Sequence, residues 1–317
     1  MSDKKAIYRE FCRTKGNLPV FLYDWWLDSV CGKNWNVALV KPDNEVLAFM
    51  PYYIKTVFGY NISVMPQLTQ FLGPWINYPA DLKETNKAEY EKKMMSELIA
   101  QLPGTACFDQ NFHYSVSNWL PFYWKGYSQT TRYTYVIEDI EHTERVFNNF
   151  TPSKRKNINK ASEIVEVKFD LGAEEFYENH KHTLEKQGQK ISYSKELFLK
   201  IHEQVYAHRS GRTIYAVDKN GIIHSALFVV WSKYSAYDLI SSIDADHKNS
   251  ESASLLIWEI IKNLSGKINR FDFEGSMIES VERSFRQFGT VQKAYFSITR
   301  CDSASYKIFR SIREKFR

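Results

Sequence analysis

The sequence predicts an α/β chain built from two copies of one unit. Residues 36–54 and 213–231 each read as an apolar strand, a polar turn and a longer apolar strand. Helical segments precede both hairpins, and a strand, a helix and a further strand follow both. The 317 residues also suffice for two domains of roughly 150 residues each. We therefore expect an N-terminal domain over residues 1–150 and a C-terminal domain over residues 151–317.

The elements follow one another in a regular order. In the first copy, a helix over 86–102 and a strand over 105–109 follow the hairpin. In the second, Asn220-Gly221 is typical of a two-residue hairpin turn. The spacing of Leu255, Leu256, Trp258, Ile260 and Ile261 predicts a helix over 250–264 with one buried face, and a strand over 268–273 follows it. Between the copies we expect a strand at 133–137, a short helix at 142–150, a helix that begins at Pro152, and helices over 172–187 and 194–208.

The composition excludes several classes of protein. Gly and Pro number only 13 and 9, which excludes collagen-like and low-complexity chains. No apolar run approaches the roughly 18–20 residues that a membrane helix requires. Residues 1–17 are polar and lack the apolar centre of a signal peptide. We therefore expect a soluble, cytoplasmic chain with no integral membrane segment.

The cysteines and histidines predict neither disulfides nor a metal site. Cys12, Cys31, Cys107 and Cys301 lie far apart and form no CxxC pair, so we expect reduced thiols. The His180-x-His182 pair lies on a predicted helix, where side chains two residues apart point to different faces. We predict that the chain holds no metal ion and no resident cofactor.

The usual catalytic motifs are absent. The chain has no GxSxG, GxxxxGK[ST] or GxGxxG segment, which argues against hydrolases, P-loop NTPases and Rossmann dehydrogenases. One candidate is the segment SKRKNINKA, in which Lys154, Arg155 and Lys156 stand near a helix start and can clamp an anionic group. A solvated basic face is the structural alternative. Residues 151–317 carry a net charge of +6 (27 Lys and Arg against 21 Asp and Glu), which suits an anionic ligand.

Two further segments are candidates. Ser250 or Ser252 can cap the helix over 250–264, whose free N–H groups could hold a phosphate or an oxyanion. Glu274, Gly275 and Ser276 follow the strand over 268–273, at a usual position for site residues in α/β sheets. Gly275, like Gly289 further along, allows backbone to approach a ligand closely.

The order of several segments resembles the FemAB-like acyltransferases of the GNAT superfamily. LPVFLYDWWLDSVCGKNW, VLAFMPYYIK, LTQFLGPWINYP, TYVIED with FTPSKRKNINKA, and FDFEGS with ERSFRQFG occur in this order and span nearly the whole chain. The resemblance implies tandem GNAT-like α/β domains, each a mixed, mostly antiparallel sheet flanked by helices. It also implies amino-acid transfer from aminoacyl-tRNA to the amino group of a peptidoglycan precursor.

The resemblance carries roles to particular residues. The family commonly has Phe-Lys where this chain has Phe285-Arg286, and that Lys stabilises charge at the reacting ester. Arg286 keeps the charge but cannot act as a base, so its expected role is electrostatic. Arg286, Phe285 and Glu274 are therefore the candidate catalytic residues. Lys154, Arg155, Lys156, Gly275, Ser276, Ser250 and Ser252 are the candidate substrate-binding residues.

The donor and the acceptor remain open at this point. The superfamily's coenzyme A turn has a central glycine, which is Glu251 here, and a carboxylate opposes a pyrophosphate. This departure favours an aminoacyl-tRNA donor, and hence tRNA as a partner, over acyl-CoA. The chain lacks the long coiled-coil arm that some tRNA-dependent members carry. An acyl-CoA-dependent N-acyltransferase and a non-catalytic GNAT-like binding protein remain alternatives, and the acceptor is a cell-wall precursor or another small amine. The sequence leaves the oligomeric state open.

Overall fold

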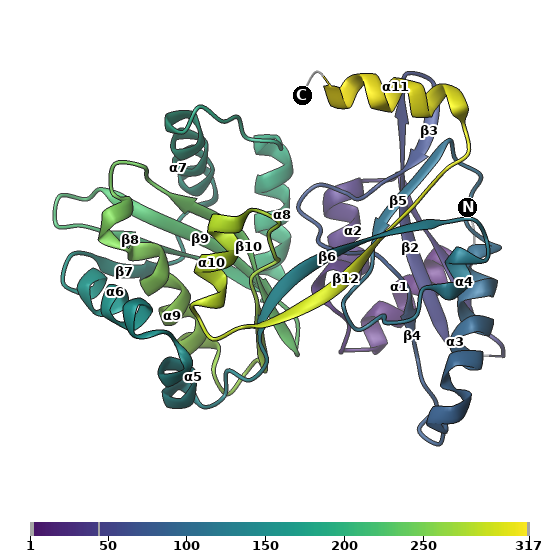
Figure 1. Ribbon diagram of the computed structural model, residues 1–317, viewed down its shortest axis with the longest axis horizontal. Coiled ribbons are helices and arrows are strands. Elements are labelled where there is room, and N and C mark those ends of the chain that lie inside the picture. The colour runs from purple at the N-terminus through teal and green to yellow at the C-terminus, as the bar shows by residue number, and fades with distance from the viewer. Residues whose placement is uncertain (1–2, 44, 316–317) are drawn as a thin grey trace. The chain divides into compact units, whose positions relative to one another are not determined.

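The computed structural model describes residues 3–43 and 45–315, and the chain forms two compact units (Figure 1). Unit 1 comprises residues 1–16, 21–132 and 294–317, and unit 2 comprises residues 17–20 and 133–293. The expected boundary between residues 150 and 151 lies inside unit 2, and the C-terminal residues belong to unit 1. Two strands, β6 (Ser128–Ile137) and β12 (Val291–Cys301), carry the chain from one unit into the other.

Unit 1 is a mixed sheet with helices. Its strands are β1 (Trp35–Val40), β2 (Ala48–Val57), β3 (Tyr60–Ser63), β4 (Trp75–Ile76) and β5 (Cys107–Asn111), together with most of β12. Its helices are α1 (Asp3–Thr14), α2 (Asp24–Cys31), α3 (Glu84–Ile99), α4 (Leu120–Tyr123) and α11 (Ala304–Lys315), and a short 3₁₀ helix, η1 (Val20–Leu22), precedes α2. The strand order is β1-β2-β3-β5-β12, with β4 paired to β2. Only the pair β3–β5 is parallel among the pairs described in this unit.

Unit 2 has the same kind of sheet. Its strands are the second half of β6, then β7 (Glu166–Phe169), β8 (Gly211–Val217), β9 (Ile223–Trp231), β10 (Ser235–Ile243) and β11 (Arg270–Asp272). Its helices are α5 (Thr143–Asn149), α6 (Pro152–Ser162), α7 (Ala173–Lys186), α8 (Lys195–Ala207), α9 (Ser252–Leu264) and α10 (Glu279–Arg286), and the 3₁₀ helix η2 (Lys248–Ser250) precedes α9. The strand order is β6-β11-β10-β9-β8-β7. The pair β10–β11 is parallel, and the other described pairs are antiparallel.

The pairing pattern confirms the predicted repeat. In unit 1, β1, β2 and β3 pair antiparallel and β5 adds in parallel; in unit 2, β8, β9 and β10 do the same and β11 adds in parallel. In each unit an antiparallel strand lies next to the parallel one, and this strand comes after the other copy of the repeat in the chain. β12 pairs with β5 in unit 1, and β6 pairs with β11 in unit 2. The fold class predicted from the sequence is therefore confirmed.

The hairpins form where predicted, but the second turn is longer than two residues. β8 ends at Val217 and β9 begins at Ile223, because the register shifts between Ala216 and Val217. The Asp218 carboxylate accepts hydrogen bonds from the backbone N–H groups of Asn220 and Ile222, both at 2.9 Å. The Asn-Gly signal located the turn correctly, whereas the register shift set its length.

The core of unit 2 explains the apolar run of β9, which is buried on both faces of the sheet. Leu227 and Val229 belong to the core cluster that includes the buried face of α9. Phe228 points the other way and contacts Phe176 of α7 and Phe198 of α8, at ring-centroid distances of 6.1 and 5.6 Å. Because successive side chains of a strand alternate between faces, a strand covered by helices on both sides must be apolar throughout.

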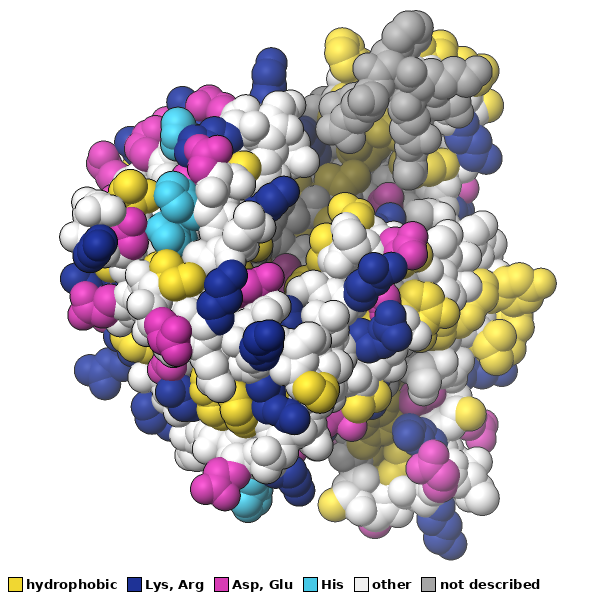
Figure 2. All heavy atoms as spheres, turned by 60° about the vertical axis from the view of Figure 1, so that its left-hand side comes forward, with side chains coloured by type: hydrophobic (Ala, Val, Ile, Leu, Met, Phe, Trp, Pro, Cys, Tyr) yellow, Lys and Arg dark blue, Asp and Glu magenta, His cyan; other side chains and the backbone are white. Residues whose placement is uncertain are grey.

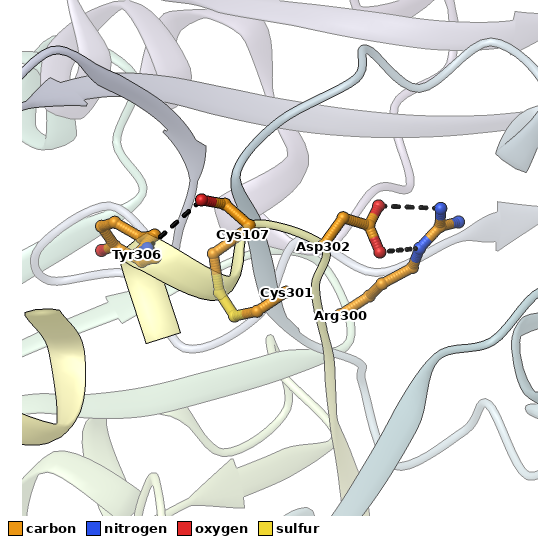
Figure 3. The surroundings of a disulfide bond; sticks show 6 residues. Cys107, Arg300, Cys301, Asp302 and Tyr306 are labelled. Atoms are coloured by element: carbon orange, nitrogen blue, oxygen red, sulfur yellow. Dashed lines mark hydrogen bonds and ion pairs between the residues drawn. A yellow bond between two sulfur atoms is a disulfide. The ribbon is translucent and has the colours of Figure 1, made fainter. Parts of the chain in front are cut away.

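The prediction of four reduced thiols is wrong for two of them. Cys107 in β5 and Cys301 in β12 form a disulfide, which Figure 3 shows beside Tyr306 and the Arg300–Asp302 ion pair. The two cysteines are direct neighbours in the antiparallel register, although 194 residues separate them in the chain. Cys12 and Cys31 are free and buried. The distance along the chain concealed a pairing that the sheet creates.

Candidate active site

Three carboxylates gather where the parallel strands of unit 2 end. Tyr237 of β10 pairs with Asp272, the last residue of β11. Glu274 lies two residues beyond the carboxyl end of β11, and Asp238 follows Tyr237 at the point where β10 stops pairing with β11, inside a strand that continues to Ile243. A bulge interrupts β10 between Asp238 and Ile240. Open α/β sheets bind ligands at the carboxyl ends of parallel strands. The fold therefore places Glu274 where the sequence predicts a site residue.

Burial sets the protonation of this carboxylate cluster. Burial raises the pKa of Glu274 well above its ordinary value of 4.5, and the nearby Asp272 and Asp238 raise it further. Burial also raises the pKa of Asp238 to about 6, against a hydrogen bond from the Ser241 hydroxyl at 2.8 Å. Glu274 Oε1 and Asp238 Oδ1 are buried and accept no hydrogen bond from the described part of the chain. Such atoms are costly to bury, which makes this cluster a candidate for a site that receives a proton or a polar ligand.

The turn after β11 holds Glu274 in a strained conformation. Glu274 has a φ of +58° and Gly275 a φ of +73°, so two successive residues occupy the left-handed region. The Glu274 backbone N–H donates to Asp272 Oδ1 at 2.8 Å, and this contact fixes the turn. A non-glycine residue at positive φ is rare and is found preferentially at functional sites.

The two glycines are required for reasons other than those expected. A Cβ at Gly275 would lie 2.1 Å from the carbonyl oxygen of Tyr133 in β6, and a Cβ at Gly289 would lie 2.6 Å from that of Asn149. A close approach to the glycine backbone exists at both positions, where the sequence analysis expected one to a ligand. Its partner is the protein's own backbone, and the close fit holds the Glu274 turn against β6.

Lys154 is buried, so the structural alternative of a solvated basic face is wrong for this residue. Its side chain is 3% exposed, and its ammonium lies 4.6 Å from the centre of the Phe288 ring. Lys154 Nζ donates to Ser254 Oγ of α9 at 3.1 Å and to Ser284 Oγ of α10 at 3.3 Å. No carboxylate in the described residues forms an ion pair with it, and burial lowers its pKa, with Glu251 opposing. An unpaired buried ammonium is costly to the fold, which marks Lys154 as a candidate for binding an anion.

The two residues after Lys154 behave differently from it. Arg155 donates from Nη1 to the carbonyl oxygens of Asn148 and Phe150, both at 2.7 Å, and so caps the end of α5. Lys156 is exposed. Of the basic cluster, therefore, Lys156 alone has the surface position that the sequence suggested, while Arg155 joins two helices of unit 2.

The segment that contains Phe285 and Arg286 is helix α10. Phe285 packs on the core of unit 2 and contacts the rings of Phe273 and Tyr135, at centroid distances of 4.8 and 6.1 Å. The Arg286 side chain is 67% exposed, and its Nε donates to Glu282 Oε1 at 3.1 Å, one helical turn earlier. An exposed pair of this kind holds the side chain only weakly, so Arg286 can leave Glu282 for another anion.

The serines before α9 do not cap it, contrary to the prediction. The residue at the cap position is Glu251, at a φ of +59°, and its side chain makes no capping hydrogen bond. Ser252 Oγ instead accepts from Ser225 Oγ at 2.8 Å and from Ser250 Oγ at 3.1 Å, and Ser250 and Ser252 are both buried. Ser276, in the Glu274 turn, accepts the backbone N–H of Ile278 at 3.0 Å.

Unit 1 closes the corresponding strand end with its own chain. The dipeptide Phe-Asp occurs at 108–109 in β5 and at 271–272 in β11, and the second residue after it is Asn111 in unit 1 and Glu274 in unit 2. The Asn111 carbonyl accepts hydrogen bonds from the N–H groups of Leu72 and Gly73, both at 3.1 Å, and its side chain donates to the Gln70 carbonyl at 3.2 Å. Of these two corresponding residues, Glu274 of unit 2 is the titratable one, and its Oε1 is the unsatisfied oxygen.

Sequence reasoning missed Asp238, Asp272, Ser254 and Ser284. Asp238 and Asp272 had a visible signal, because each is the single acidic residue of its strand. An acid in such a position is buried with the strand, and burial perturbs its pKa. The partners of Lys154 gave no signal in the sequence, because Ser254 and Ser284 lie 100 and 130 residues away from it along the chain.

Other features of the surface do not coincide with these residues. A groove of about 430 Å³ in unit 2 is lined by residues that include Tyr206, Arg212 and Trp231, and none of the predicted site residues lines it. Asp139, Glu141 and His142 lie close enough together to hold a metal ion, but Asp139 already pairs with Arg145. On the face drawn in Figure 2, Lys and Arg side chains are dispersed among Asp and Glu.

Comparisons with known proteins agree with this architecture. Residues 151–277 match the family described as acetyltransferase (GNAT) domain. The chain is similar to the crystal structure of FemX, with 12% identity and a TM-score of 0.69 over 93% of this chain and 96% of that one. It is similar to L-PGS from Bacillus licheniformis, with 11% identity and a TM-score of 0.56 over 98% and 96% of the two chains. A tandem GNAT protein from the clavulanic acid biosynthesis pathway has 8% identity and a TM-score of 0.51 over 84% and 83%.

No curated protein sequence matches the chain significantly. Within the described residues, each helix is too short or too polar to cross a lipid bilayer. The tandem topology confirms the predicted fold, and the domain match confirms the resemblance to the GNAT superfamily over residues 151–277. Residues 151–277 thus match a GNAT acetyltransferase domain, within a chain that has the fold of FemX.

Proposed function

We propose that unit 2 transfers an aminoacyl group from an ester donor to an amine acceptor and so forms an amide. The observation that carries this proposal is Glu274, a carboxylate with a raised pKa and an unsatisfied buried oxygen at the end of β11. An amine is protonated near neutral pH and must lose a proton before it can attack a carbonyl. A carboxylate whose pKa is raised toward the working pH is suited to accept that proton.

The proposed reaction moves two protons. Glu274 first takes a proton from the acceptor ammonium. The amine nitrogen then attacks the ester carbonyl carbon, so that a C–N bond forms and the carbonyl oxygen becomes an oxyanion. When the tetrahedral intermediate collapses, the C–O bond to the leaving group breaks. The nitrogen gives up its second proton to the leaving alkoxide, which departs as a hydroxyl group.

Two cations have roles in this scheme. We assign oxyanion stabilisation to Arg286, in keeping with the resemblance, because its exposed guanidinium is held only by Glu282 and can turn toward a bound ester. We assign the binding of an anionic part of the donor to Lys154, whose ammonium is bound by the hydroxyls of Ser254 and Ser284 and pairs with no carboxylate among the described residues. A bound anion would supply the counter-charge that the fold omits.

The turn before α9 favours an aminoacyl ester over coenzyme A. Glu251 places a carboxylate at the first turn of this helix, where a pyrophosphate would bind, and the Ser250 hydroxyl donates to Ser252 Oγ. These residues do not fit a pyrophosphate. We therefore propose aminoacyl-tRNA as donor and a peptidoglycan precursor as acceptor, with acyl-CoA as the alternative donor.

The test incubates the purified chain with a mixture of radiolabelled aminoacyl-tRNAs, or with labelled acetyl-CoA, and a lysine-containing peptidoglycan precursor. We expect label in a product that resists mild base, as an amide does and an ester does not. We also expect tRNA binding to weaken steeply with salt. Glu274→Gln should abolish the product, whereas Asn111→Asp, a change at the corresponding place in unit 1, should leave it unchanged.

The outcomes separate the alternatives. Amide formation from acetyl-CoA alone would replace the tRNA donor by acyl-CoA. Binding of either donor without any product would support a non-catalytic protein. Full activity in Glu274→Gln would show that another group takes the proton.

A further inference from the structure

A groove in unit 2 forms where α8 and α9 end. It has a volume of about 430 Å³, within the range of sites that bind small molecules. Gly211, the first residue of β8, and Trp231, the last residue of β9, line it together with Lys267, which precedes β11. Glu274 follows β11, so the groove lies at the other end of this strand from the carboxylate cluster.

The groove has an excess of positive charge. Arg209, Arg212 and Lys267 line it, against the single carboxylate of Asp170 among its described lining residues. Arg212 already binds that carboxylate, because its Nε and Nη2 donate to the two oxygens at 3.2 and 2.6 Å. Arg209 and Lys267 form no ion pair within the described part of the chain, and Lys267 Nζ donates to the Asn263 carbonyl at 3.0 Å. Two cations therefore line the groove without a counter-charge.

The charges just outside the groove are balanced. Two acids form ion pairs, Glu166 with Lys168 at 3.1 Å and Glu259 with Lys262 at 2.8 Å. Four further exposed charges, two of each sign, stand outside the groove: Glu141, Glu203, Lys233 and Arg270. The unpaired positive charge is therefore a property of the groove itself.

Arg209 occupies a position that glycine normally fills. Two backbone hydrogen bonds close the end of α8, from Ser210 N–H to the Val205 carbonyl at 2.9 Å and from Arg209 N–H to the Tyr206 carbonyl at 3.1 Å. Arg209 has a φ of +51° there. Helix ends of this form usually have glycine at the residue with positive φ, because a side chain is strained in that conformation. The chain thus keeps a guanidinium in the groove at a cost to the fold.

Trp231 gives the groove a fixed aromatic surface. Its indole N–H donates to the Arg209 carbonyl at 3.0 Å, and its backbone N–H donates to the Ser210 carbonyl at 2.7 Å. The half-buried side chain also packs on the core of unit 2. These contacts hold the ring beside the backbone of Arg209.

We propose that this groove binds a nucleotide, with its phosphate on Arg209 and Lys267 and its base on Trp231. Cations that no carboxylate neutralises are suited to bind phosphate, and arginine can do so with two parallel hydrogen bonds. Aromatic rings beside basic residues bind nucleotides because the bases stack on them. An inorganic anion would leave Trp231 without a role. A free nucleotide and a nucleotide within an RNA chain share this chemistry, and the experiment separates them.

The test measures binding of adenosine and uridine 5′-diphosphates to the full chain by calorimetry, and binding of unacylated tRNA by filter retention. Arg209→Gly should lower the affinity about tenfold or more. The same variant should keep or raise the melting temperature, because glycine relieves the strain at positive φ. A purely structural arginine would not produce this combination.

The aromatic surface is tested by two replacements of Trp231. Trp231→Leu should lower the affinity about tenfold, whereas Trp231→Phe keeps a ring and should lower it less than about threefold. If Trp231→Leu fails to fold, the phenylalanine variant and Arg209→Gly still test the groove.

Matched controls lie elsewhere in unit 2. Lys190 and Lys219 are exposed, stand outside the groove and form no ion pair among the described residues. Replacing both by Gln should leave nucleotide binding unchanged, although it removes as much charge as Arg209→Gly combined with Lys267→Gln. Glu274→Gln should bind nucleotides as the wild type does, so this proposal stands or fails independently of the proposed function.

The outcomes identify the ligand or overturn the proposal. Binding of a diphosphate that Arg209→Gly weakens identifies a free nucleotide, and binding of tRNA alone that the same variant weakens identifies a nucleotide of an RNA chain. Failure of the wild type to bind either, or equal binding by Arg209→Gly, would overturn the proposal. Inorganic phosphate that binds as tightly as the diphosphates, or full affinity in Trp231→Leu, would show that the groove recognises no base and would overturn it as well.

Discussion

Glu274→Gln should abolish activity and stabilise the protein at the same time. The substitution keeps the size of the side chain and its place at the end of β11 but removes the ionisable proton. Loss of a general base typically lowers kcat about 10²–10⁴-fold. A structural residue behaves in the opposite way, since its removal destabilises the fold.

The sign of the stability change follows from the raised pKa. Between the unfolded pKa of 4.5 and the higher folded pKa of Glu274, the folded state keeps a proton that the unfolded state has lost. The free energy of unfolding of the wild type therefore falls as the pH rises through that window. Glutamine cannot ionise, so the variant should be more stable than the wild type at pH 7 and equally stable below about pH 4.

Asp238 supplies the scale of the effect. Burial raises its pKa from 3.8 to about 6, and each pKa unit corresponds to about 1.4 kcal/mol. The ionisation of Asp238 thus opposes folding by about 3 kcal/mol at neutral pH, as an upper bound. Asp238→Asn should therefore increase the unfolding free energy at neutral pH by part of this amount. It should also shift the pH dependence of kcat, because the Asp238 charge acts on Glu274.

The assay pairs urea unfolding from pH 4 to pH 8 with kcat measured on the same preparations. We expect the stability curves of wild type and Glu274→Gln to converge at low pH and to separate above it. A variant that is less stable than the wild type at pH 7, or one that keeps the wild-type kcat, would refute the assignment of Glu274 as a buried base.

Substitutions at four further positions, with one control position, test the rest of the site and fold. Lys154→Ala should cost about 2–3 kcal/mol of unfolding free energy because the lysine stem is buried, whereas Lys154→Met should cost less than about 1 kcal/mol. Both variants should raise KM for the donor. A loss of only about 0.5 kcal/mol or less in the alanine variant would contradict the burial. Arg286→Ala should lower kcat about 10²–10³-fold and change the unfolding free energy by at most about 0.5 kcal/mol, as steady-state kinetics and urea titration will show. Gly275→Ala should lower the unfolding free energy by more than about 2 kcal/mol in urea titration, because its Cβ would meet a carbonyl oxygen. Gly221→Ala is the control, because Gly221 also has a positive φ but has open space around it. It should cost only about 1 kcal/mol. Cys301→Ser should lower the unfolding free energy by about 2–4 kcal/mol and make Tm insensitive to a reducing agent; a wild-type Tm that does not respond to the reducing agent would show that the disulfide does not contribute.

Local patterns in the sequence predicted most of the elements. The helices expected over 86–102, 172–187, 194–208 and 250–264 form with ends shifted by a few residues, because apolar spacing and helix-start signals act within a few turns. The repeat of hairpin, strand, helix and strand was visible for the same reason. Pro152 begins α6 as predicted, and Thr151 caps it by accepting the Lys154 N–H at 3.3 Å.

The candidate site could be predicted only in part. Glu274 follows an apolar strand and is flanked by Gly275, which made the turn visible in the sequence. Its raised pKa depends on Asp238, from a strand that lies 36 residues earlier in the chain and pairs in parallel beside it. Parallel pairing is a long-range contact that no local pattern specifies.

The burial of Lys154 and the disulfide depended entirely on tertiary structure. Lys154 stands among basic residues and reads as surface, but α6 packs against α9 and turns it toward Ser254 and Phe288. Cys107 and Cys301 become neighbours only because β12 returns to pair with β5. The sequence by itself determined the repeated α/β units and the turn that carries Glu274, since hydrogen bonding and side-chain periodicity are local. The tertiary structure decided which charges are buried and which oxygens lack partners, because desolvation depends on what the rest of the chain packs against each group.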